Sequence, residues 1–325
     1  MKEVLNISGY SVDLKRYNNS WEEVRKFVNT MGCSGVELLI GGEHDNTIPL
    51  DLISSIHLPD WLGWLRLWRE PESIPADCEP FKLAYYFGAA TPEDLIRTFI
   101  DNLEKAAGLG ATYAVFHVTH IELDAFFTRD HRYTTREVLF SAASFLNTAC
   151  KNFPKGEPPV TIGFENLWWP GLTLLSQDEI DYFTNHLEFD NWFFVLDTGH
   201  MMNAMDTRTE EDGIRKILSV MDTLSSATLE RIRAVHFHCS MSGKYQKENF
   251  FCDPPSGFSS LMYGEQISLL MPMVAKLDQH RPFTNPECKM ILQKVNPDYL
   301  VHEFISRTKE EFEEKIRTQK NCLKN

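Results

Sequence analysis

Four apolar segments of the sequence carry, at or near their ends, an acid or imidazole that could bind a divalent cation. They read TIGFENL at 161–167, FFVLDTGH at 193–200, AVHFHCS at 234–240 and YLVHEF at 299–304. Such groups are costly inside an apolar strand unless something compensates them. Because strand side chains alternate between two faces, we expect the inward residue nearest the end of each segment to be a ligand; these are Glu165, Asp197, His238, which lies nearer the mouth than His236 on the same face, and Glu303. The mixed oxygen and nitrogen set predicts a Mn, Zn, Mg or Co site, because a structural zinc site would favour cysteine.

Eight strand patterns that alternate with helical patterns would position these residues. The expected strands lie at 4–7, 35–40, 55–58, 113–119, 161–167, 193–197, 232–238 and 299–304. Helical patterns between them begin with capping residues, such as Ser20 with Glu23 three positions later, or Thr91 followed by Pro92. This alternation predicts an α/β fold, a single (β/α)8 TIM barrel that occupies residues 1–325 as one domain.

Two long segments interrupt the alternation, at about 59–88 after the third strand and 240–277 after the seventh. Both follow the carboxyl ends of strands, where the active sites of such barrels lie. We expect them to act as lids or substrate loops. The second segment could instead meet another copy of the chain, so a homo-oligomer stays open.

Composition and charge limit the partners. The 32 Lys and Arg and 46 Asp and Glu give a formal net charge of −14, which disfavours nucleic acid as a partner. The seven cysteines are scattered without a CxxC pair, which is typical of reduced thiols in a cytoplasmic protein. No signal-peptide pattern or run of about 18 apolar residues occurs, so we expect no membrane association.

The motifs ENLWWPG, LDTGH, VHFHCS and LVHEF together resemble those of the xylose-isomerase-like TIM barrels. That superfamily includes sugar isomerases, epimerases and apurinic-site nucleases of the endonuclease IV type. The resemblance implies a metal held by Glu165, Asp197, His238 and Glu303. In the epimerase branch of the superfamily, the two glutamates would also move protons on opposite faces of the substrate. His200 matches the histidine of the family's DxxH motif and is a further catalytic candidate.

Further positions resemble the nuclease branch. His57 in SIHLPDW, His117 in VFHVTH and the pair Asp278 and His280 in LDQH match its additional ligands. With His200 they would fill nine positions, enough for two or three metal ions. Two features depart from that branch: the 38-residue connection at 240–277, and the sequence His238-Cys-Ser-Met where a His-x-Lys-Asp tail is common.

Each candidate also has a purely structural interpretation. His57 and His117 could be hydrogen-bonded core residues, and Asp278 and His280 could form the polar end of a helix. His236 is interpreted as a residue of the barrel interior. Trp168 and Trp169 are candidates for stacking on a substrate, and Glu37 for contacting it from inside the barrel. We interpret the remaining histidines as surface or loop residues: His120, His131, His186 and His302.

The leading hypothesis is a divalent-metal-dependent isomerase or epimerase acting on a sugar or related polyol carbonyl. A metal would stabilise the enediolate while Glu165 and Glu303 take and return a proton. A lyase that cleaves carbon-glycosides through the same enolate is an alternative. A multinuclear phosphoester hydrolase resembling endonuclease IV is another, as is different metal chemistry or a binding module. The expected partner is a small molecule, a carbohydrate in the leading hypothesis.

Overall fold

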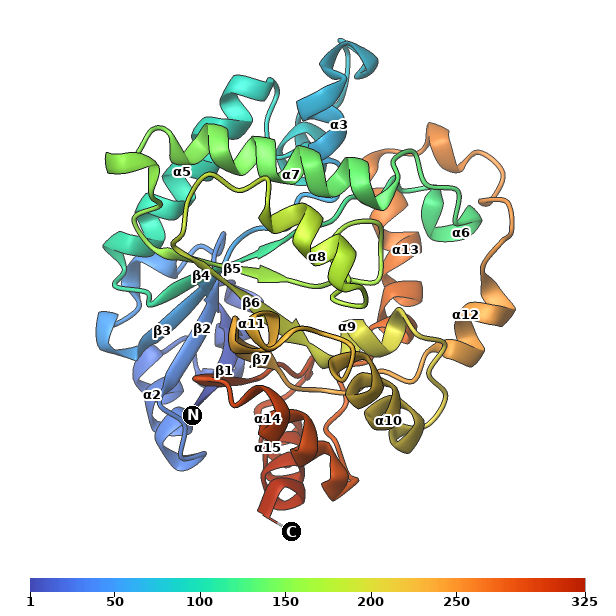
Figure 1. Cartoon of the computed structure of the whole chain (residues 1–325). Helices are drawn as coiled ribbons and strands as arrows, with labels where there is room; N and C mark the ends of the chain where they lie inside the picture. The colour runs from blue at the N-terminus through green and yellow to red at the C-terminus, as the bar shows by residue number, and fades with distance from the viewer. Residues whose placement is uncertain (325) are drawn as a thin grey trace.

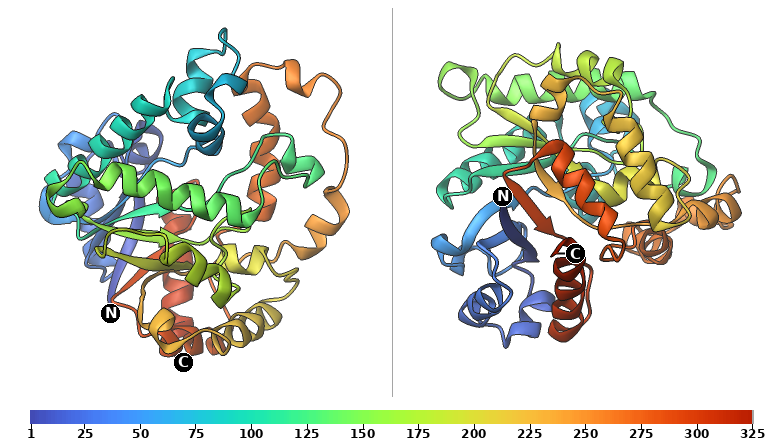
Figure 2. Two further views of the ribbon diagram at one scale, coloured as in Figure 1. Left: turned by 45° about the horizontal axis from the view of Figure 1, so that its top comes forward. Right: turned by 60° about the horizontal axis from the view of Figure 1, so that its bottom comes forward.

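Eight parallel strands close into a barrel in the computed structural model, which describes residues 1–324 (Figure 1). Each strand pairs with its neighbour in sequence, and β1 pairs with β8 to complete the ring (Figure 2). The strands are β1 (Lys2–Ser8), β2 (Gly35–Leu39), β3 (Ile53–His57), β4 (Tyr113–His117), β5 (Thr161–Glu165), β6 (Trp192–Asp197), β7 (Ile232–His236) and β8 (Tyr299–His302). The predicted TIM barrel is therefore confirmed.

Helices surround the barrel, and their starts follow the capping signals in the sequence (Figure 1). The side chains of Ser20 and Thr91 accept hydrogen bonds from backbone N–H groups in the first turns of α2 and α5. The main helices that follow strands are α2 (Trp21–Thr30), α5 (Pro92–Gly108), α7 (Thr135–Cys150), α8 (Gln177–Thr184), α9 (Thr198–Asn203), α10 (Glu210–Met221), α11 (Ser226–Glu230), α14 (Lys289–Val295) and α15 (Lys309–Lys324). Short helices α1 (Ser11–Leu14) and α6 (Ala125–Thr128) lie in loops. None of the helices in the described part of the chain is both long and apolar enough to cross a bilayer.

The two long segments fold into helices that contact each other. The first holds α3 (Trp64–Arg69), α4 (Pro80–Lys82) and a π-helical turn at Leu83–Phe87, and the second holds α12 (Gly243–Asn249) and α13 (Tyr263–Leu277). The backbone N–H of Tyr263 donates to Glu79 Oε2 at 3.2 Å, and the Tyr263 ring lies 5.8 Å from that of Tyr86. The two segments thus support one another beside the barrel mouth.

The barrel interior changes from apolar to polar along the strand direction. Its amino-terminal part is a buried apolar cluster to which Tyr113, Val115, Phe193, Val195 and Ala234 contribute. The next inward positions, two residues further along their strands, carry His117, Glu165, Asp197 and His236. Apolar side chains therefore fill much of the interior near the amino ends of the strands, and potential metal ligands gather at the carboxyl ends.

Several strands end two residues earlier than the sequence pattern predicts. β4, β5, β7 and β8 end at His117, Glu165, His236 and His302, whereas the expected ends were 119, 167, 238 and 304. His238 and Glu303 consequently lie in the loops just beyond their strands. The earlier end of β7 affects which of His236 and His238 lies at the centre of the barrel.

Candidate metal centre

Acids and imidazoles at the carboxyl ends of the strands form overlapping groups that could each hold a metal ion. Within each group, one potential ligand atom per residue lies within 4.8 Å of the others. The outer group is His57, His117 and Glu165, and the central group is Glu165, Asp197, His236 and Glu303. The far group is His200, Asp278 and His280, and the bridging group is His238, His280 and Glu303. Because Glu165, His280 and Glu303 are shared, the groups form one continuous centre.

The outer group is held by strands β3, β4 and β5. Glu165 Oε2 lies 3.1 Å from His117 Nε2 and 3.4 Å from His57 Nε2. The other nitrogen of each ring also faces an oxygen: His57 Nδ1 hydrogen-bonds the Leu58 carbonyl at 2.9 Å, and His117 Nδ1 lies within ion-pair distance of Asp60 Oδ2, at 3.4 Å, without a hydrogen bond. Each Nε2 therefore faces the shared carboxylate, as a ligand nitrogen does when its other nitrogen is fixed.

The central group contains His236 in the position that was predicted for His238. His236 Nδ1 lies 2.9 Å from Glu303 Oε2, 3.3 Å from Glu165 Oε1 and 3.9 Å from Asp197 Oδ2. His238 points instead to Asp197, with Nε2 2.9 Å from Oδ2, and belongs to the bridging group. The two histidines differ because β7 ends at His236, which is the last inward residue of the strand, whereas His238 lies in the loop that follows.

The far group joins the start of α9 to the segment after α13. Asp197 caps α9, because its Oδ1 accepts a hydrogen bond from the His200 backbone N–H at 2.6 Å. This places the His200 ring against Asp278 Oδ2, 3.4 Å from its Nε2. His280 Nε2 lies 2.6 Å from the same oxygen, and its Nδ1 lies 2.8 Å from the Glu303 carbonyl. Asp278 and His280 thus face the centre rather than forming only a helix end.

The residues fit divalent cations, because several buried ligand atoms lack a hydrogen-bond partner. Glu165 Oε1, His236 Nδ1, Glu303 Oε2 and His238 Nδ1 are all buried without one. Among the described residues, every ion-pair partner of Glu165, Asp197, Asp278 and Glu303 is an imidazole, never Lys or Arg. Buried carboxylates with free lone pairs and facing imidazoles are the donor set that Zn²⁺ or Mn²⁺ accepts.

The electrostatics of the centre show how the acids are balanced by protons. Burial opposes ionisation of Glu165, yet His236 and His117 hold its pKa well below the usual range. Burial disfavours a charged His236, yet Glu165 and Glu37 raise its pKa well above the usual range. Burial likewise opposes ionisation of Asp278, and His280 and His200 lower the pKa of its carboxyl. Protons on imidazoles therefore neutralise the carboxylates, and cations could take their place.

Glu37 contacts His236 of the central group from inside the barrel and does not reach the mouth. It is fully buried, and its Oε1 lies 2.9 Å from His236 Nε2. Ser55 Oγ and Tyr113 Oη donate to Glu37 Oε2 at 2.9 and 3.0 Å. The expectation that Glu37 contacts substrate does not fit this position. Its carboxylate instead orients the His236 ring so that Nδ1 faces the other acids.

Gly199 allows His238 to approach α9. A Cβ atom at this position would lie 2.2 Å from Cε1 of the His238 ring, closer than real contacts permit. Thr198 Oγ1 accepts a hydrogen bond from the His238 backbone N–H at 3.2 Å and donates to the His238 carbonyl at 2.6 Å. The TG pair of LDTGH thus fixes the loop after β7 against the start of α9.

The two tryptophans after Glu165 have different environments. Trp168 is half-buried, and its ring centroid lies 4.9 Å from that of His200. Trp169 is buried at 2% exposure, against Phe126 and beneath the Arg129 guanidinium. Only Trp168 is therefore placed to meet a substrate directly.

Two histidines interpreted as surface or loop residues are buried. His302 lies outside the barrel wall between Glu3 and Gln319, and His120 lies beside Glu122 and Tyr133. Both belong to or follow apolar strands, and most of the polar residues beside them come from distant segments. The burial of His120 and His302 is therefore hard to predict from the residues next to them in the sequence.

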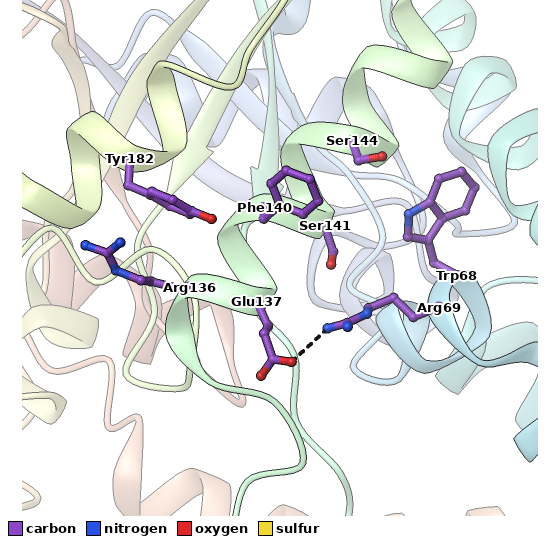
Figure 3. Close-up of a pocket in the computed structure, with 8 residues that line it drawn as sticks. All are labelled: Trp68, Arg69, Arg136, Glu137, Phe140, Ser141, Ser144 and Tyr182. Carbon is purple, nitrogen blue, oxygen red and sulfur yellow. Dashed lines mark hydrogen bonds and ion pairs between the residues drawn. The ribbon is translucent and has the colours of Figure 1, made fainter.

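A separate pocket lies on the outer helical layer. Its volume is about 300 Å³, and it is lined by α3, α7 and α8, with Arg69 paired to Glu137 (Figure 3). None of the residues lining it belongs to the ligand groups. The centre at the barrel mouth is accordingly the candidate functional site.

Comparisons with known proteins agree with this fold. The sequence matches the family model described as xylose isomerase-like TIM barrel over residues 26–322, and no curated protein matches it. Similar solved structures include endonuclease IV from Thermus thermophilus, at 16% identity over 100% of this chain and 99% of that chain, with a TM-score of 0.53. An L-ribulose 3-epimerase shares 13% identity over 99% and 87% of the chains, with a TM-score of 0.53. The IOLI protein with a zinc atom shares 14% over 99% and 96%, with a TM-score of 0.52. These identities indicate a shared fold, and because the family model spans most of the sequence, the chain belongs to the xylose isomerase-like TIM-barrel family.

Proposed function

We propose that the protein is a multinuclear metal-dependent hydrolase of phosphoesters, acting on small molecules. The observation that carries this proposal is the sharing of ligands between groups, above all of Glu165 between the outer and central groups. A carboxylate with one oxygen toward each of two groups is typical of a bridging ligand in a centre of adjacent ions. Divalent ions there would supply Lewis-acid stabilisation of the charge that develops on a phosphoester during transfer.

The chain's own residues hold this centre in place. Each ring also has a neighbour at the nitrogen that points away from the centre. The Leu58 carbonyl hydrogen-bonds His57 Nδ1, while Asp60 and Glu37 lie within ion-pair distance of His117 Nδ1 and His236 Nε2. Rings with such neighbours need little rearrangement when they bind a ligand. Asn166 adds rigidity, since its side chain donates to the Asp197 carbonyl at 3.0 Å and accepts from the Asp197 N–H at 2.8 Å.

The net charge argues for a small substrate. At −14 the chain repels long polyanions, and the release of counterions that drives binding to DNA needs a basic surface. A small phosphoester carries few charges and can be accepted through local groups. We therefore infer that a duplex nucleic acid is not the substrate.

A metal-dependent sugar isomerase or epimerase is the second candidate. Trp168 favours it, because a half-buried aromatic ring beside the centre suits the apolar face of a sugar. That reaction needs one ion with Glu165 and Glu303 as proton carriers, and leaves His57, His117, Asp278 and His280 without a chemical task. The far and outer groups therefore favour the hydrolase over the isomerase.

Metal counting together with a hydrolysis assay tests the proposal. The protein purified without added metal should contain two or three divalent ions per chain by elemental analysis. It should also release inorganic phosphate from, or cleave, members of a panel of small phosphomonoesters and phosphodiesters. One ion per chain, with interconversion of ketose epimers and no phosphoester cleavage, would replace the hydrolase by the isomerase.

A further inference from the structure

A second pocket adjoins the metal centre on the side of the long connection after β7. It has a volume of about 460 Å³, and its lining includes Arg129, Trp168, Asn203, Lys247 and Phe251. Two of its lining residues neighbour His200 of the far group. Trp168 packs against the ring of His200, and Asn203 lies three residues after His200 on α9. The pocket therefore lies next to the far group of the centre.

Arg129 is a cation held in this pocket without an acid. Its guanidinium lies 4.3 Å from the ring centroid of Trp169 and 4.0 Å from that of Phe250. Nη2 donates to Gln246 Oε1 at 2.8 Å, and no acid lies within ion-pair distance of Arg129 among residues 1–324. Burial lowers the pKa of Arg129 to about 10, so the side chain is still charged at neutral pH. Arg129 is half-buried, and charges withdrawn from solvent are normally paired, whereas this guanidinium has donors to spare.

Asn203 adds a second unpartnered donor. The residue is 3% exposed, its Oδ1 accepts a hydrogen bond from Ser242 Oγ at 2.6 Å, and its Nδ2 has no partner. Gln246 connects the two donors, because its Nε2 donates to the Asn203 carbonyl at 2.8 Å while its Oε1 accepts from Arg129. The network therefore fixes both donors in one wall and leaves each with capacity for an acceptor.

The remaining charges of the lining do not cancel this excess of donors. Lys247 is exposed on α12 and adds a second cation. Asp206 is the one acid in the lining, and its carboxylate is engaged by Arg208, with Oδ2 3.1 Å from Nη2. The lining therefore carries two cations against one acid, together with an amide donor, beside the metal centre.

We propose that this pocket binds an oxyanion, a second phosphate or carboxylate group of the substrate, through Arg129, Asn203 and Lys247. This inference rests on the proposed function, which puts the reacting phosphoester of the same substrate at the metal centre. It narrows the substrate class to small phosphoesters that carry another anionic group a short distance from the reacting phosphorus. The guanidinium between two rings presents an edge that matches a planar carboxylate or two phosphate oxygens.

The test is a calorimetric titration of the purified, metal-containing protein with inorganic phosphate. Wild type should bind phosphate at the centre and at this pocket. Arg129→Met, which keeps apolar bulk between the two rings, should weaken one of the two binding events by at least about tenfold. Lys247→Met should weaken the same event while leaving the fold untouched, since that side chain is exposed. Lys244→Met on the same helix is the matched control, because it removes the same charge outside the lining.

Metal content and hydrolysis, measured on the same samples, separate this inference from the proposed function. If Arg129→Met and Lys247→Met bind phosphate as wild type does, the pocket is not an oxyanion site, whatever the centre catalyses. If Arg129→Met fails to fold, Lys247→Met against Lys244→Met decides. A phosphate site that depends on Lys247 in a protein without phosphoesterase activity would leave the oxyanion site standing and remove the hydrolase.

Discussion

His236 Nδ1 lies 2.9 Å from Glu303 Oε2, while Nε2 of the same ring lies 2.9 Å from Glu37 Oε1. One carboxylate therefore holds the imidazole from inside the barrel, and the other meets it at the mouth. Within the central group, His236 is the imidazole whose free nitrogen faces Glu165 and Glu303 together. This relationship makes His236, and not His238, the nitrogen ligand that we expect in the central group.

Substitution of His236 should therefore remove the central ion. We expect His236→Ala to contain at least one ion fewer per chain than wild type by elemental analysis, since a metal ligand without a substitute usually costs at least about tenfold in affinity. His238→Ala is the comparison, because it leaves all four members of the central group in place. A His236 variant with wild-type metal content, beside a His238 variant that has lost the central ion, would restore the ligand set inferred from the sequence.

Substitution of Glu165 should remove more metal ions than substitution of either histidine of the outer group. Glu165→Gln keeps the shape of the side chain but removes the charge shared by the outer and central groups. We expect it to lose two ions, and His117→Ala to lose one, because His117 belongs to the outer group alone. Elemental analysis of the two variants purified side by side measures the difference. Equal losses would argue that Glu165 does not bridge.

Glu303→Gln should abolish turnover while the fold survives. The side chain is a member of both the central and bridging groups, and its Oε2 is buried without a hydrogen-bond partner. Loss of this carboxylate should lower kcat by at least about a hundredfold, given the several kcal/mol that a metal site contributes. Circular dichroism and thermal unfolding check the fold. Undiminished activity in a folded variant would exclude Glu303 from the reaction.

The barrel and most of the centre could be predicted from the sequence because each rests on a local pattern. Apolar runs that end in TIGFE or FFVLD put Glu165 and Asp197 at the ends of their strands, and alternation puts both on the inward face. The cap at Asp197 then turns the chain so that His200 faces inward. Asp278 and His280 were matched by the spacing of LDQH, although the segment that carries them could not be oriented from sequence.

The choice between His236 and His238 could not be predicted, because both share one face of an apolar run. Alternation fixes the face and not the depth, which depends on where hydrogen bonding between β6, β7 and β8 stops. The depth of Glu37 inside the barrel does not follow from alternation for the same reason. Arg129 and Gln246 carry no signal, since they lie 117 positions apart and meet through packing of loops.

The acidic chain should not bind abasic duplex DNA. Its net charge of −14 repels the duplex, and the pocket lined by Arg129 and Lys247 holds too few cations to neutralise many phosphates. Fluorescence anisotropy with a labelled abasic duplex at low salt should show no saturable binding at micromolar protein. Tight binding that weakens steeply as salt rises would indicate a nucleic-acid substrate after all.

Glu3 should link the stability of the barrel to pH. Its carboxylate lies 2.9 Å from His302 Nε2 and 2.8 Å from Lys320 Nζ, so it ties β1 to β8 and to α15. Burial opposes its ionisation, but His302 and Lys320 lower its pKa from 4.5 to about 2. The folded state thus favours the charged form, and the resulting stability is present above pH of about 4.5 and disappears as the pH falls toward about 2.

Glu3→Gln should accordingly lower the free energy of unfolding at pH 7 by on the order of 1 kcal/mol, because solvent screens part of the attraction at this partly exposed side chain. The difference from wild type should shrink as the pH is lowered from 4.5 toward 2, because the wild-type carboxylate becomes protonated. Urea unfolding at a series of pH values measures it, with the exposed Glu72→Gln as the matched control. A difference between wild type and Glu3→Gln that stays constant from pH 7 to about pH 2 would show that the charge of Glu3 does not stabilise the fold.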